Sequence, residues 1–332
     1  MPPGFLFCAD PLRGSRPDAH FADEVAAVRA ADAPRALIDH DALLAGAARE
    51  AVARVPRGSG AYWYRGWMMP VGRYEELERA LRDRDCTLLT PAEQYGRAHE
   101  LPGWYEVFEA LTPRSVWRAA EPGAAPSPAE LAALVAPLGP GAAIVKDYVK
   151  SRKHEWDEAC YVPDRADTAR LASVVDRFFA LQEDTLAGGL VVRDFEPFVG
   201  RGEVRVWWVD GEAALVTPHP DAPRPGTDQD PMNGLPTPDL SPIRAAVRAL
   251  GCRFVTTDLA LRDDGPGGDD SGASGGSGAD SGAGDHGTWR VVEVGDGQVS
   301  GLPRQGTALP TDELIAALAS AQVSVGTRPP SR

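Results

Sequence analysis

Apolar residues over the first 120 positions occur in two patterns: short continuous runs, and longer stretches in which they recur every three or four residues. A short run bounded by turn residues is typical of a buried strand, and the wider spacing is typical of an amphipathic helix. Strands are predicted at residues 5–8, 36–38, 61–69 and 87–90, and helices at 21–31, 41–52, 74–84 and most of 91–111. Strands that alternate with helices predict a small α/β domain with a parallel sheet over residues 1–120.

The pattern changes after a proline-rich stretch that begins at Glu121. Helices are predicted at 128–138, 166–181, 241–250 and 311–321, and strands at 142–149, 190–195, 203–209, 212–217, 254–261 and 289–294. Asp210-Gly211 separates two of these strands, and Asp-Gly between apolar runs is a strong signal for a two-residue β-hairpin. Residues 121–325 are therefore expected to form an α+β domain with antiparallel strands.

Residues 263–287 consist mostly of Gly, Ser, Ala and Asp, with six aspartates and no lysine or arginine. Such a segment buries too little apolar surface to offset the entropy cost of ordering. We expect a disordered insertion that joins two paired strands. Calcium binding is the alternative for an acidic, glycine-rich tract, but neither EF-hand nor nonapeptide spacing is present.

The composition is that of a globular protein with a substantial core: of 332 residues, 43% are apolar and 25% charged. The net charge of −14 argues against nonspecific nucleic-acid binding and against docking on an anionic membrane. The chain has no basic, apolar leader and no run near the ~20 apolar residues of a membrane span. Its four cysteines lack Cys-x-x-Cys spacing, so buried thiols in a reducing cytoplasm are expected.

The basic residues include only three lysines, Lys146, Lys150 and Lys153, within eight positions. The excess of arginine fits the codon bias of a GC-rich genome, under which lysine persists where a compact ammonium group is needed. Lys146 and Lys150 are four residues apart on a predicted strand and therefore share a face. A polyphosphate between them would offset their repulsion; a solvated strand face is the alternative.

The strands that follow end in polar residues suited to a nucleotide. Asp194, Phe195 and Glu196 end an apolar strand and resemble a hinge whose backbone reads a base. Glu203 and Arg205 share one face of the next strand, where a carboxylate suits ribose hydroxyls and a guanidinium suits a phosphoryl group. A cross-strand salt bridge is the alternative for this pair.

Asp258 and Glu293 lie on the two strands that flank the insertion, so hairpin pairing places them side by side. Adjacent carboxylates are costly unless a cation neutralises them, and carboxylate, phosphate and water oxygens are ligands of Mg²⁺. A solvated pair at the strand ends is the alternative.

In this order, the motifs resemble the ATP-grasp superfamily over about residues 142–298. The stretches KDYVKSRKHEWDEACYV, VVRDFEPF, EVRVWWVDGE, TTDLAL and VVEVGDGQVSGLP are most similar to a bacterial and phage branch marked by an arginine and two lysines. The resemblance implies an α/β domain followed by an ATP-grasp fold, in which two subdomains with antiparallel sheets clamp ATP. The nucleotide-binding residues that it implies are Lys146, Lys150, Asp194, Phe195, Glu196, Phe198 and Glu203.

The resemblance also implies Arg205 and Lys150 as catalytic groups and Asp258 and Glu293 as Mg²⁺ ligands. The superfamily has an asparagine as third ligand two residues after the glutamate, where this chain has glycine. Either Asp296, the next residue, substitutes for it or the third ligand differs.

Arg65 is a candidate for contact with the substrate, because an unpaired charge among aromatic residues would be expensive. Ser115 and Trp117 are candidates for the wall of the same cleft, and His154 and Glu155 for a loop over ATP. A structural role is the alternative for each.

Members of the superfamily mostly join a carboxylate to an amine through an acyl phosphate. The resemblance therefore implies an ATP- and Mg²⁺-dependent ligase for a small-molecule or peptide carboxylate and an amine, with no nucleic acid or membrane partner. A phosphotransferase on the same fold and a non-catalytic nucleotide-binding module are the alternatives. The sequence gives no indication of oligomeric state.

Overall fold

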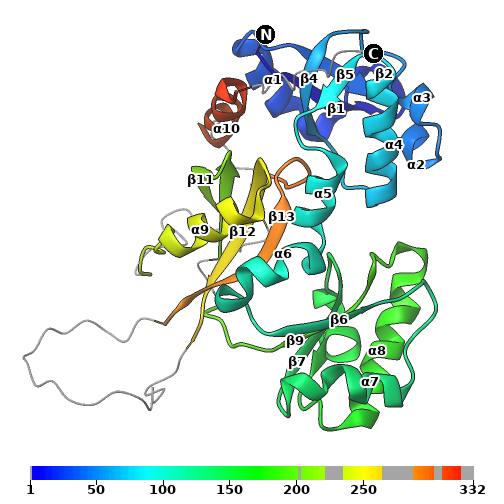
Figure 1. Cartoon of the computed structure of the whole chain (residues 1–332), viewed down its shortest axis with the longest axis vertical. Coiled ribbons are helices and arrows are strands. Elements are labelled where there is room, and N and C mark those ends of the chain that lie inside the picture. The colour runs from blue at the N-terminus through cyan, green and yellow to red at the C-terminus, as the bar shows by residue number, and fades with distance from the viewer. Residues whose placement is uncertain (1, 201–202, 221–234, 264–286, 303–308, 323–332) are drawn as a thin grey trace, which may run out of the picture.

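The computed structural model describes residues 2–200, 203–220, 235–263, 287–302 and 309–322. They form three units, each around one β-sheet. Figure 1 shows the four-stranded C-terminal sheet between the upstream unit, which contains both ends of the described chain, and the middle unit. The predicted insertion at 263–287 falls almost entirely outside the described residues.

The upstream unit is the parallel α/β arrangement that its pattern predicts. β1 pairs in parallel with β3 and β4, β4 pairs in parallel with β5, and β2 adds an antiparallel edge. The elements are β1 (Gly4–Asp10), β2 (Arg13–Pro17), α1 (Ala22–Ala30), β3 (Arg35–Ile38), α2 (His40–Leu44), α3 (Ala48–Ala51), β4 (Gly60–Arg65), α4 (Val71–Arg82), β5 (Cys86–Leu88), α5 (Ala92–His99) and α6 (Leu101–Phe108). The helix predicted at 41–52 is two short helices, because Gly46 has a φ of +84° between them.

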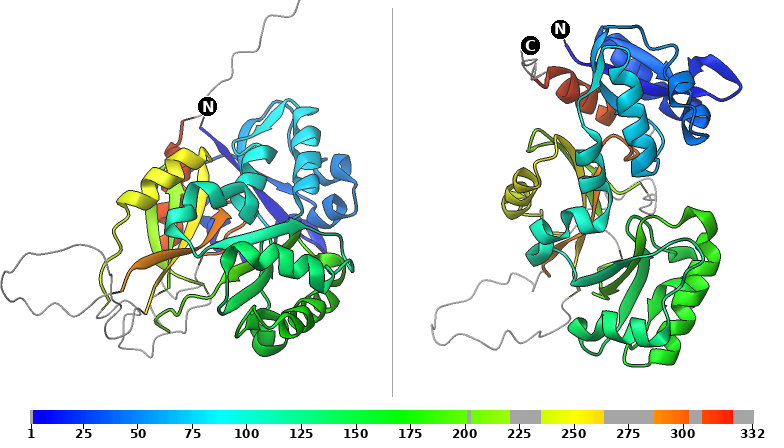
Figure 2. Two further views of the ribbon diagram at one scale, coloured as in Figure 1. Left: turned by 60° about the horizontal axis from the view of Figure 1, so that its bottom comes forward. Right: turned by 45° about the vertical axis from the view of Figure 1, so that its right-hand side comes forward.

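The middle unit is a four-stranded antiparallel sheet in the order β6-β9-β7-β8. Its elements are β6 (Ser115–Ala119), α7 (Pro128–Val135), β7 (Ala143–Asp147), the π-helical turn η5 (Trp156–Cys160), β8 (Tyr161–Val162), α8 (Thr168–Gln182) and β9 (Gly189–Asp194). Because β6 pairs with β9, residues 115–119 belong to this sheet although they precede the expected boundary at 120. Figure 2 shows α8 on the side of this sheet turned away from the upstream unit.

The C-terminal sheet is antiparallel, in the order β11-β10-β12-β13. Its elements are β10 (Val204–Val209), β11 (Glu212–Pro218), α9 (Ser241–Leu250), β12 (Phe254–Leu261), β13 (Trp289–Asp296) and α10 (Leu309–Ser320). The hairpin predicted at Asp210-Gly211 is confirmed: both residues have positive φ, as a primed turn requires.

The apolar core is divided in a way that positions the site. One cluster joins the upstream sheet to α10 and to one face of the C-terminal sheet through Trp207 and Phe254. A second packs α6 and α9 on the other face of the C-terminal sheet. A third lies within the middle unit between its sheet and helices α7 and α8. The upstream unit and the C-terminal sheet are therefore packed together, whereas the middle unit has a core of its own.

Candidate functional site

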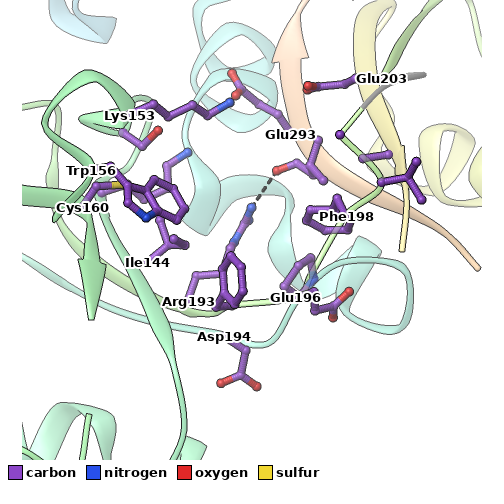
Figure 3. Close-up of a pocket in the computed structure, with 18 residues that line it drawn as sticks. Ile144, Lys153, Trp156, Cys160, Arg193, Asp194, Glu196, Phe198, Glu203 and Glu293 are labelled. Carbon is purple, nitrogen blue, oxygen red and sulfur yellow. Dashed lines mark hydrogen bonds between the residues drawn. The ribbon is translucent and has the colours of Figure 1, made fainter. Parts of the chain in front are cut away.

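A cavity of about 350 Å³ lies between the middle unit and the C-terminal sheet (Figure 3). One wall carries Lys146, Lys153, Trp156 and Arg193, and the opposite wall carries Glu203 and Glu293. The connection between β9 and β10 closes one end with Asp194, Phe195, Glu196 and Phe198. Basic and acidic side chains thus face each other across a largely apolar hollow, an arrangement suited to a phosphorylated ligand with a bound cation.

Lys146 lies on β7 with 6% of its surface exposed, and its Nζ donates to the carbonyl of Val149 at 3.1 Å. Burial lowers the pKa of this ammonium group. Lys153 follows in a short helical turn. Figure 3 shows Lys153 and Glu293 extending toward each other from opposite walls of the cavity.

Lys150 does not line the cavity, which corrects the expectation that it shares a strand face with Lys146. The strand ends at Asp147, whose Oδ1 accepts hydrogen bonds from the backbone of Val149 at 2.7 Å and Lys150 at 2.5 Å. This side-chain turn reverses the chain, so the alternation of faces stops before Lys150. Lys153, not Lys150, is the second lysine at the cavity.

The predicted pairing of Asp258 with Glu293 is confirmed, because the register of β12 and β13 places them directly opposite each other. On the other side, Asp258 is opposite Arg205, whose Nε and Nη2 donate to its two carboxylate oxygens at 2.7 and 2.8 Å. Burial disfavours ionisation of Asp258, but the hydrogen bonds from Arg205 and His219 hold its pKa below the usual value. A row of guanidinium and two carboxylates therefore crosses three strands.

His219, which the sequence did not single out, follows β11 and joins this row. Its Nε2 lies 3.4 Å from Asp258 Oδ2 and 3.2 Å from Arg205 Nη2. One ligand atom each of Glu203, His219 and Asp258 lie within 4.8 Å of one another. Burial raises the pKa of Glu203, so a nearby cation would stabilise its charged form.

The hinge residues reach the cavity mainly through their backbone and rings. The Asp194 carboxylate pairs with Arg165 at 2.8 Å, and the Glu196 carboxylate accepts two hydrogen bonds from Arg290 at 2.9 and 3.0 Å. These ion pairs fix the connection between β9 and β10 in place. Phe195 and Phe198 line the cavity.

An aromatic group at the cavity was also not predicted. Trp156 stacks on Tyr161 with ring centroids 5.2 Å apart, and Phe195 packs edge-on against both rings. Trp156 remains 38% exposed, so part of a flat ring is available to a planar base. The sequence signal was Trp156 itself, shortly after the lysines, which we had assigned no role.

Arg193 is the third lining residue that sequence reasoning missed. It lies on β9 at the end of the cavity next to the hinge, with 7% of its surface exposed. Burial lowers the pKa of its guanidinium to about 10, so it stays charged at neutral pH. An arginine within an apolar strand has no local pattern that marks it as functional.

Arg65 does not face the cavity, contrary to our expectation. Only 1% of it is exposed, and its Nε and Nη2 donate to the Glu24 carboxylate at 2.6 and 2.8 Å. It also donates to the carbonyls of Gly297 and Ser300. The charge that seemed to need a substrate is neutralised within the protein.

Asp296 is also outside the cavity. It is fully buried, and its Oδ1 accepts from the backbone and side chain of Gln298 at 2.9 and 3.2 Å. Burial raises its pKa to about 7. The β13 strand turns Asp296 toward α4 and α5 rather than toward Glu293, so it is not placed as a third metal ligand.

The remaining candidates lie beside the site without lining it. Ser115 accepts a hydrogen bond from Arg193 Nε at 3.0 Å, and Trp117 packs edge-on against Tyr105. His154 and Glu155 lie on the turn that carries Lys153.

Two antiparallel sheets that close on a cavity with these lysines and carboxylates define an ATP-grasp fold. A family model described as an ATP-grasp domain, family 3 of the clade named for one arginine and two lysines, matches residues 137–267 and 270–318. The chain therefore belongs to this clade of ATP-grasp proteins.

Solved structures of the same fold cover nearly the whole chain. The crystal structure of the D-cycloserine synthetase DcsG has a TM-score of 0.53 at 15% identity and covers 95% of this chain and 99% of its own. A RimK domain ATP-grasp protein from Sphaerobacter thermophilus has a TM-score of 0.52 at 12% identity, over 95% and 98%. The ATP-grasp ligase PsnB with a minimal precursor has a TM-score of 0.51 at 11% identity, over 96% and 100%. No curated protein sequence matches the chain.

The described helices include none that is long and apolar enough to cross a membrane.

Proposed function

We propose that this protein is an ATP-dependent carboxylate–amine ligase that acts through an acyl phosphate. The observation that carries the proposal is the cavity itself: two lysines on one wall, carboxylates on the other, and a backbone hinge at one end. This distribution matches the parts of ATP, because phosphates need cations and a base needs backbone groups and flat apolar surfaces.

In this proposal the adenine lies at the hinge between Phe195 and Phe198, with Trp156 beside it. Lys146 and Lys153 hold the phosphates from the β7 wall, and Glu203 binds the ribose. The γ-phosphate then points to the row formed by Arg205, Asp258 and Glu293.

The donor set fits Mg²⁺. Asp258 and Glu293 are opposite each other on neighbouring strands, and carboxylate oxygens are the ligands that this cation prefers. Arg205 occupies one acceptor position on each Asp258 oxygen, and each keeps a further lone pair. Bound there, the cation would neutralise charge on the transferred phosphoryl group.

The reaction has two steps. A carboxylate oxygen of the substrate attacks the γ-phosphorus, and the bond to the leaving ADP breaks. An amine nitrogen then attacks the acyl carbon; phosphate leaves, the amine loses a proton, and an amide remains. Arg205, Lys146 and Lys153 stabilise the charge that gathers in the first step. No nucleophilic side chain of the protein is required.

The substrates proposed are a small-molecule or peptide carboxylate and an amine. Two structures of this fold are described as a D-cycloserine synthetase and as a ligase with a precursor, which supports this range of acceptors. The net charge of −14 does not favour nucleic acid as a partner.

The test is to measure ADP release with panels of carboxylates, each with and without amines. Release that yields product only when both are present supports the ligase. Phosphorylated product formed from a hydroxyl compound without any amine would instead establish a phosphotransferase. Failure to bind Mg-ATP at all would overturn both.

A further inference from the structure

Arg193 is held by three groups on three other elements. Its Nε donates to Ser115 Oγ on β6 at 3.0 Å, and its Nη1 donates to the carbonyl of Val292 on β13 at 2.6 Å. Its guanidinium carbon lies 5.7 Å from the ring centre of Trp104 on α6. These contacts fix the plane of the guanidinium at the boundary of the middle unit and the C-terminal sheet.

The fourth group of this side chain is unused. Arg193 Nη2 is buried and has no hydrogen-bond partner among the residues that the structure describes. The groups that bind Arg193 are a hydroxyl, a carbonyl and a ring, all neutral. Glu293 and Glu196 are the acidic residues whose fields act on it, and no ion pair joins either to Arg193 in the described chain. A buried cation with an unsatisfied N–H is costly unless an anion arrives.

The strand register shows what reaches Nη2. On the cavity side of the middle sheet, Arg193 is opposite Ile144, and Lys146 is opposite Val191. Arg193 is thus two residues, about 6–7 Å, from the Lys146 row toward the hinge. If the base lies at the hinge and the terminal phosphates lie at the lysines, Arg193 faces the part of the nucleotide between them.

We propose that Arg193 Nη2 donates a hydrogen bond to a non-bridging oxygen of the α-phosphate of the bound nucleotide. The proposal rests on the proposed function, since it requires a nucleotide in this cavity. A charge-assisted bond to an anionic oxygen satisfies both the free donor and the buried charge. The same guanidinium then connects the nucleotide to Val292, the residue before Glu293.

The α-phosphate and purine N7 are both acceptors in this region, and binding measurements without metal separate them. Adenosine has N7 but no phosphate, whereas AMP has both. In the wild-type protein AMP should bind more tightly than adenosine, and Arg193→Gln should reduce that preference by about 10- to 100-fold, the usual value of a hydrogen bond to a charged group. Adenosine affinity should change by less than about threefold.

Ser115→Ala is the matched control, because it removes one partner of Arg193 and leaves Nη2 in place. It should keep the preference for AMP over adenosine. A second readout is the ³¹P chemical shift of bound AMP, which should differ between wild type and Arg193→Lys. If Arg193→Gln fails to fold, Arg193→Lys replaces it in the binding comparison, because it keeps the charge and loses the planar fork.

Each outcome decides the proposal. Equal losses of adenosine and AMP affinity in Arg193→Gln would show that the arginine reads the base, and would overturn the α-phosphate contact. An unchanged preference for AMP would also overturn it. If the wild-type protein binds neither AMP nor ATP, the proposed function itself fails, which is a distinct result.

Discussion

Three lysines within eight residues reach different surroundings. Lys146 is buried on a strand, Lys153 lines the same cavity from a helical turn, and Lys150 lies beyond the turn at Asp147. Proximity in sequence is therefore no guide to which ammonium groups meet the phosphates.

This difference gives a direct prediction. Lys146→Met and Lys153→Met should each weaken ATP binding by about 10- to 100-fold, because each removes a charged partner of a phosphate and keeps the aliphatic stem. Lys150→Met, the matched control, should change affinity by less than about twofold. Titration of nucleotide by calorimetry checks all three. A loss in Lys150→Met equal to that in Lys146→Met would contradict this placement.

Asp296 makes the stability depend on pH. Burial raises its pKa from an ordinary 3.8 to about 7, so the folded state retains a proton that the unfolded state loses. The unfolding free energy should therefore fall as pH rises from about 4 to 7. Asp296→Asn should remove most of this decline and raise stability at pH 8 by about 1–3 kcal/mol. Chemical denaturation at pH 5 and pH 8 is the measurement; a decline of the same size in both proteins would rule Asp296 out as its source.

At the level of elements, the pairing of β12 with β13 gives two neighbouring carboxylates different duties. Asp258 is buried and carries two hydrogen bonds from Arg205, whereas Glu293 is half-buried and faces the cavity. Asp258 supports the sheet as well as the site, and Glu293 serves the site.

Substitutions should separate these duties. Asp258→Asn weakens a buried ion pair and should lower the unfolding free energy by about 2–4 kcal/mol. Glu293→Gln should cost less than about 1 kcal/mol of stability and still abolish turnover. Thermal unfolding and ADP release, measured on both variants, provide the comparison. Turnover near the wild-type level in Glu293→Gln would exclude it as a metal ligand.

The sequence was informative where local chemistry decides the structure. Asp210-Gly211 requires positive φ, and the strands around the insertion can pair in only one sense, so the hairpin and the Asp258–Glu293 pair were predictable. Lys150 was misplaced because strand alternation was extended past Asp147, whose side chain turns the backbone.

Other residues were beyond sequence reasoning because distant partners decide their roles. Arg193 binds residues 78 and 99 positions away, and no local pattern encodes those contacts. Arg65 was correctly expected to need a partner, but that partner is Glu24, 41 positions upstream, rather than a ligand.

Across the whole molecule, the Glu24–Arg65 pair joins the upstream unit to the segment after β13. Arg65 binds the Glu24 carboxylate on α1 and the carbonyls of Gly297 and Ser300, while Arg205 reaches the carbonyl of Gly301 at 3.3 Å. One short segment therefore contacts both the buried ion pair of the upstream unit and the arginine of the site.

Breaking this pair should be more harmful than replacing it. Glu24→Gln or Arg65→Met alone leaves a buried charge uncompensated and should cost about 3–5 kcal/mol of stability. The double variant Glu24→Leu/Arg65→Met should recover at least half of that loss. Urea denaturation of the three proteins tests this; a double variant as unstable as the sum of the singles would mean that the hydrogen bonds to Gly297 and Ser300 dominate.

The division of the core into a shared part and a separate part has a mechanical consequence. The chain enters the middle unit just before Ser115 and leaves it after Asp194, and these two crossings lie next to each other because β6 pairs with β9. Two adjacent crossings form an axle, about which the middle unit can swing while its own apolar cluster stays intact. The upstream unit, locked to the C-terminal sheet, is the fixed jaw. Spent nucleotide can thus leave by rotation of one jaw, with neither core opened to water.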